Sequence, residues 1–97
     1  EPIGKLARIA HEYDIIFHTD AVQAFGHIPV NVDSMNVDML SASSHKFNGP
    51  KGTGFLYIRR ECRAHPFIYG GGQEKGMRSG TENVPGIIGM AEAARVS

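Results

Sequence analysis

Apolar residues at helical spacing predict two amphipathic helices, one over residues 2–13 and one from Pro85 onward. Asn83 stands just before the second helix and is a residue type that caps helix N-termini. Residues 21–25 have room for one further helical turn, which Gly26 would end. Helical segments are therefore expected on both sides of the middle of the chain.

Short continuous apolar runs predict strands at residues 15–17, 36–42 and 54–58. Residues 29–33 alternate between apolar and polar positions, as an extended connection does. The length of the connection between the first two strands favours neighbouring strands of a parallel or mixed sheet. The sequence thus predicts an α/β fold with a mixed or mostly parallel sheet and flanking helices.

Polar side chains gather where the first two predicted strands end. Residues 18–20 follow the first strand, and residues 41–52 follow the second with hydroxyls, an imidazole and an amine. Ligands of open α/β sheets bind at the carboxyl ends of strands, so we expect Asp20 and Lys46 to share a pocket there. Asp20 could instead be the N-cap of the next helix. Lys46 could form an imine with an aldehyde, or be an ordinary surface lysine.

Composition narrows the classes of function. The chain of 97 residues is long enough for one small domain but short for a cofactor enzyme. Ten basic and ten acidic residues balance, which argues against nucleic-acid binding. Residues 46–78 nevertheless carry seven basic and two acidic side chains, a net of +5. This local charge would favour binding of an anion such as phosphate, or it could simply form a solvated basic face.

One cysteine cannot form an internal disulfide, and no apolar run has the length of a membrane span. A soluble cytoplasmic protein without membrane contact is therefore expected. The five histidines show no metal-ligand spacing, and residues 49–54 do not meet the P-loop pattern, so no metal site is expected. The glycine-rich residues 70–81 form a long polar loop of a kind that is commonly functional or disordered.

Three motifs resemble the cysteine desulfurases of the NifS/IscS type, which are pyridoxal-phosphate (PLP) enzymes of the class V aminotransferase group. The motifs are His-Thr-Asp-Ala-Val-Gln at 18–23, Ser-Ala-Ser-Ser-His-Lys at 41–46 with Gly-Pro-Lys-Gly-Thr-Gly after it, and the glycine-rich residues 70–83. They occur in the family's order and spacing. The resemblance implies that residues 1–97 are a single incomplete segment of the large PLP-binding domain of a fold type I enzyme, since family members are about four times as long.

The resemblance implies roles around the cofactor ring for three residues. Lys46 matches the lysine that holds PLP as a Schiff base and later moves protons at the substrate's α-carbon. Asp20 matches the carboxylate that pairs with the pyridinium nitrogen and keeps the ring protonated. Gln23 matches the amide that hydrogen-bonds the phenolic oxygen of the ring.

The resemblance assigns other residues to the cofactor phosphate. Ser43 and His45 match phosphate-binding residues, and Thr81 matches a phosphate contact donated by the partner subunit of a homodimer. Arg78 is expected to serve the same loop or the dimer contact, not catalysis. Cys62 stands outside the family's late cysteine loop and is expected to be non-catalytic.

The parent reaction implied by the resemblance converts L-cysteine to L-alanine and passes sulfur as a persulfide to an iron–sulfur scaffold protein for cluster assembly. The family's ring-stacking histidine, catalytic cysteine loop and substrate-carboxylate arginine match nothing in this sequence, so the isolated segment is expected to be inactive. Two alternatives stay open: another class V PLP enzyme such as a selenocysteine lyase, and a non-catalytic, self-associating α/β module.

Overall fold

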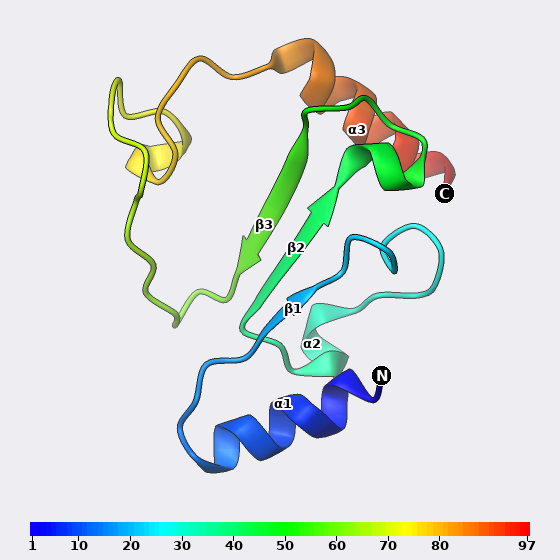
Figure 1. Cartoon of the computed structure of the whole chain (residues 1–97), viewed down its shortest axis with the longest axis vertical. Helices are drawn as coiled ribbons and strands as arrows, with labels where there is room; N and C mark the ends of the chain where they lie inside the picture. The colour runs from blue at the N-terminus through cyan, green and yellow to red at the C-terminus, as the bar shows by residue number, and fades with distance from the viewer.

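The structure, a computed structural model, describes all 97 residues and contains one three-stranded sheet. Its strands are β1 (His18–Asp20), β2 (Met39–Ser43) and β3 (Gly54–Ile58), in the order β1-β2-β3. β1 runs parallel to β2, and β3 runs antiparallel to β2 (Figure 1). The predicted mixed sheet and the predicted strand at 54–58 are confirmed.

The helices lie at opposite ends of the sheet (Figure 1). The helix α1 (Ile3–Glu12) packs against the short helix α2 (Val32–Met35) near the start of β2. The helix α3 (Val84–Val96) packs against the 3-10 helix η1 (Ser44–Phe47), which follows the end of β2. A second 3-10 turn, η2 (Glu74–Gly76), lies in the glycine-rich loop. Both long helices were predicted, and the Asn83 side chain accepts a hydrogen bond from the Gly86 N–H as the expected cap of α3.

The first strand lies later in the sequence than its apolar run predicted. Residues 15–17 are not a strand, and Ile15 and Ile16 are more than half exposed, at 56% and 55%. Pairing with the second strand begins only at Phe17, whose carbonyl accepts the N–H groups of Asp38 and Met39. Residues 18–20 are therefore the strand itself, since hydrogen bonding to a neighbour, not apolarity, defines where a strand starts.

The extended connection predicted at residues 29–33 is wrong in its second half, where α2 begins. The Asn31 side chain accepts hydrogen bonds from the N–H groups of Asp33 and Ser34, both at 3.0 Å, and so caps this short helix. Val32, which suggested alternation, packs against the core instead. An asparagine cap and one helical turn thus replace the expected extended segment.

The second strand is also shorter than predicted. Asn36 ends α2 in the left-handed conformation, with φ of 54°, and pairing starts at Met39. Residues 36–42 therefore split into a helix end and a strand. Val37, between them, is fully buried and forms the core together with Ala21 and Leu40.

The core is small, because only 11 of the 97 residues are buried. Several large apolar side chains are exposed, among them Tyr13 directly after α1, Ile88 on α3 and Phe67 in the loop before η2. No helix has the length and apolarity that a membrane crossing requires. The packing is therefore concentrated around β2, next to the strand ends that the sequence singles out.

Gly26 has a structural reason to be glycine, and this gives a prediction. Its φ is +83°, and an added Cβ would lie 2.6 Å from the Cβ of Phe47. Gly52 has a similar φ of +80° but open space around it. We expect Gly52→Ala to lower the free energy of unfolding by about 1 kcal/mol through backbone strain alone. Gly26→Ala should cost about 1–2 kcal/mol more, because the two segments must separate.

Denaturant unfolding of the two variants measures this difference. Equal losses at positions 26 and 52 would contradict a close approach between the turn at Gly26 and Phe47.

Candidate functional site

The carboxyl ends of β1 and β2 lie side by side (Figure 1). The parallel register sets Asp20 beside Ser41, and the Ala21 N–H donates to the Ser41 carbonyl at 2.8 Å. Two residues further along β2 comes Ser43, and η1 then carries His45 and Lys46. The sheet topology therefore brings the carboxylate of one strand end and the polar cluster of the next to the same edge, as the sequence predicted.

Ser43 and His45 form a hydrogen-bonded pair. The Ser43 hydroxyl lies 2.9 Å from Nδ1 of His45, and no other hydrogen bond uses this imidazole. His45 is exposed and Ser43 is half-buried. The pair thus presents a hydroxyl and the Nε2 edge of an imidazole at the strand end, a donor set that suits an anion.

Asp20 caps the turn that follows β1, where no helix forms, and uses one oxygen to do so. Its Oδ1 accepts the N–H of Val22 at 2.9 Å, while Oδ2 has no hydrogen-bond partner in the chain. The carboxylate is exposed. Gln23 is exposed in the same turn and makes no side-chain hydrogen bond. Capping and ligand contact are therefore compatible, because the cap orients the carboxylate and leaves its second oxygen available.

Lys46 is exposed, and its amine takes part in no ion pair or hydrogen bond. Its backbone is anchored, because Nε2 of His27 lies 2.7 Å from the Lys46 carbonyl oxygen. Sequence reasoning did not identify His27. His27 and Lys46 are 19 positions apart. The only local signal is Gly26, directly before His27, where the backbone passes close to Phe47.

Thr81 lies apart from this cluster. It is exposed on the segment between η2 and α3, which Figure 1 shows arching away from the sheet. It has no hydrogen bond to Ser43, His45 or Lys46. The structure therefore brings Asp20 and the 43–46 segment to one edge but does not add Thr81 to them within one chain.

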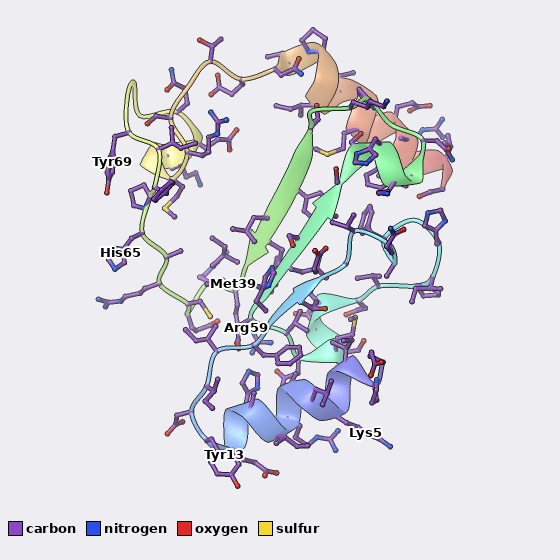
Figure 2. All side chains as sticks on the ribbon, in the orientation of Figure 1. Lys5, Tyr13, Met39, Arg59, His65 and Tyr69 are labelled. Carbon is purple, nitrogen blue, oxygen red and sulfur yellow. The ribbon has the colours of Figure 1, made fainter.

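A second polar cluster surrounds Asp38, at the opposite end of β2. Asp38 is 6% exposed, and its Oδ2 accepts hydrogen bonds from His11 Nε2 and from the Phe17 N–H, both at 2.7 Å. Arg59 Nε lies 3.8 Å from Oδ1, and Figure 2 shows Arg59 at this end of the sheet. Burial opposes ionisation most strongly, yet these partners together hold the pKa of the carboxyl below its ordinary value. No local sequence pattern predicted this cluster, because His11 and Asp38 are 27 positions apart.

Cys62 lies near this second cluster, not at the strand-end site. Burial raises the pKa of its thiol, and the Asp38 carboxylate raises it further. A raised pKa means less thiolate at neutral pH and a weaker nucleophile. This supports the expectation that Cys62 is not a sulfur-carrying residue.

Comparison with known proteins places the chain in a family. The sequence profile of the family described as aminotransferase class-V matches residues 1–97, the whole length. The chain belongs to the aminotransferase class-V family. This class-V chain is 63% identical over 97 residues to the cysteine desulfurase IscS of Dictyoglomus turgidum, and the match covers all of this chain and 25% of that protein. It is 52% identical to the cysteine desulfurase IscS of Methanosarcina thermophila, of which it covers 24%.

Solved structures agree with the sequence match. A NifS-like protein from Rickettsia africae superposes with a TM-score of 0.95 at 40% identity, over 98% of this chain and 26% of that one. A structure described as SspA in complex with cysteine superposes with a TM-score of 0.92 at 49% identity, over 97% of this chain and 28% of that one. The predicted family and fold class are confirmed. The class-V chain spans about a quarter of the length of the curated relatives it matches.

Proposed function

We propose that this chain is a segment of a PLP-dependent cysteine desulfurase, which converts L-cysteine to L-alanine and transfers the sulfur as a persulfide. The observation that carries the proposal is the free amine of Lys46 on η1, directly after the Ser43–His45 pair and at the same sheet edge as Asp20. The relatives named cysteine desulfurase and the cysteine complex among the structural neighbours support this choice of substrate.

The residues at this edge fit PLP group by group. PLP carries a phosphate, a pyridine nitrogen, a phenolic oxygen and an aldehyde. Ser43 and His45 offer hydrogen bonds to the phosphate, the free oxygen of Asp20 suits a protonated ring nitrogen, and the Gln23 amide suits the phenolic oxygen. Lys46 supplies the amine that the aldehyde requires. When bound, PLP accepts the electrons of a bond broken at the substrate's α-carbon.

Each side chain at this edge would have a separate role in holding the cofactor or moving a proton. The hydrogen bond from the Val22 N–H fixes the orientation of the Asp20 carboxylate. The second carboxylate oxygen can therefore stay in place beside the ring nitrogen and keep it protonated. Ser43 and His45 orient each other and would hold the phosphate end in place. The Lys46 amine, which no side chain engages, is free to attach the cofactor and to move a proton at the substrate's α-carbon.

The proposal extends to partners and place. We place the protein in the cytoplasm as a homodimer in which Thr81 reaches the phosphate site of the partner subunit, with an iron–sulfur scaffold protein as sulfur acceptor. Thr81 is exposed and stands outside its own chain's strand-end cluster, which supports a role in another subunit's site. No group of three or more metal-ligating side chains converges in the structure, and the proposal needs no metal site.

Trapping with borohydride tests the cofactor site. The 97-residue chain incubated with PLP and then reduced should carry the cofactor on Lys46, identified by peptide mass. Lys46→Ala should lose the label, because the attachment point is gone. Lys51→Ala is the matched control, since Lys51 is an exposed lysine five positions further along. A label on Lys51 in place of Lys46, or no label at all, would contradict PLP attachment in this chain.

A further inference from the structure

The position of the Lys46 amine depends on the backbone of η1, because the side chain itself has no partner. In η1 the N–H groups of Asn48 and Gly49 both donate to the Ser44 carbonyl. The Lys46 carbonyl belongs to the last turn and accepts no backbone N–H, as is usual at the end of a helix. An unpartnered carbonyl at this place would leave the turn that carries the lysine free to open.

His27 supplies the missing partner. Its Nε2 lies 2.7 Å from the Lys46 carbonyl oxygen, and since a carbonyl can only accept, Nε2 carries the hydrogen and donates it. The neutral tautomer with the proton on Nε2 and the protonated imidazolium both have this N–H. The hydrogen bond is therefore maintained whether or not His27 is charged.

The two residues before His27 hold the same turn by packing. The rings of Phe25 and Phe47 meet edge to face, with centroids 5.0 Å apart and an interplanar angle of 63°. At Gly26 the backbone approaches Phe47 so closely that no Cβ would fit. Phe47 itself is 1% exposed. Three successive residues thus fix Phe47 by packing and Lys46 by a hydrogen bond.

We propose that His27 is a positioning residue for Lys46, which closes the last turn of η1 and so limits where the lysine amine can reach. This inference rests on the proposed role of Lys46 as the PLP attachment point. Nothing places His27 against cofactor or substrate, so it acts through the backbone of Lys46. The amine needs a defined position because covalent attachment depends on the geometry of the approaching atoms.

Four variants of the 97-residue chain test this role. His27→Leu removes the hydrogen-bond donor, and His27→Asn has a side-chain N–H that is too short to reach the Lys46 carbonyl. His27→Gln restores an N–H at about the position of Nε2. His65→Leu is the control, since Figure 2 shows His65 on the segment away from the sheet. The first readout is hydrogen exchange at the Asn48 and Gly49 amides relative to the Met77 amide, which donates to Glu74. The second is the rate of borohydride-trapped PLP labelling of Lys46.

We expect His27→Leu and His27→Asn to raise exchange at Asn48 and Gly49 by about three- to tenfold and to slow labelling by a similar factor, as loss of one hydrogen bond does. His27→Gln should return both rates to the unmutated values, and Met77 should not change. Unchanged exchange in His27→Leu, or no rescue by glutamine, would overturn the proposal. If Lys46 is not labelled in any variant, PLP attachment in the 97-residue chain fails, and exchange alone decides whether His27 closes the turn.

Discussion

Alanine formation from L-cysteine is expected to fall by at least about a thousandfold when Lys46 is replaced by alanine in an active, full-length setting. A suitable setting is a chimaera in which residues 1–97 replace the matching quarter of the Dictyoglomus turgidum relative, to which they are 63% identical. The loss should be this large because one amine would both attach the cofactor and move the substrate proton. Measuring alanine released from L-cysteine gives the result.

Lys51→Ala in the same chimaera is the control and should keep its activity, because Lys51 lies in the turn beyond η1. Retained activity in the Lys46 variant would contradict its proposed role. A chimaera that releases alanine from L-selenocysteine but not from L-cysteine would favour the selenocysteine lyase alternative. One that binds no PLP and acts on neither substrate would favour the non-catalytic module.

Replacing Asp38 by alanine should lower the free energy of unfolding by about 3–5 kcal/mol. The carboxylate is buried and accepts hydrogen bonds from His11 and the Phe17 N–H, while Arg59 stands near its other oxygen. Removing it leaves the half-buried Phe17 N–H without an acceptor and removes the hydrogen bond between His11 of α1 and the residue before β2. Denaturant unfolding measures the change, and Asp33→Ala, at an exposed aspartate, is the control. A loss no larger than that of Asp33→Ala would show that the cluster contributes little.

The Asp38 carboxylate should make folding stability depend on pH, with stability falling toward acid pH. Because folding lowers the pKa of Asp38 below its ordinary value of 3.8, the folded state binds its proton more weakly than the unfolded state. Its stabilising contribution is therefore complete above the unfolded pKa and is lost as the pH falls through the folded pKa. The difference in unfolding free energy between the unmutated chain and Asp38→Ala should therefore shrink as the pH falls below about 4. A difference that stays constant down to acid pH would contradict ionic stabilisation by Asp38.

Local signals predicted the long helices well and the strand boundaries poorly. The helix α3 could be located because its periodicity and its Asn83 cap are properties of neighbouring residues. The first strand was placed three residues too early, since its start depends on hydrogen bonds between Phe17 and residues of the 38–39 segment. The helix α2 was missed because its capping residue Asn31 lies in a segment where apolar and polar residues alternate. That alternation predicts an extended segment. Strand boundaries are predicted poorly where hydrogen bonds to residues distant in the sequence determine them.

The order of residue types along the chain was enough to predict an α/β fold, to place Asp20, Ser43, His45 and Lys46 at neighbouring strand ends, and to recognise the family. These properties follow from patterns within each segment. Packing alone decided that His27 closes the turn of Lys46 and that Asp38 joins α1 to the sheet, through pairs 19 and 27 residues apart. Such contacts depend on how separate elements meet in space, which no local pattern encodes.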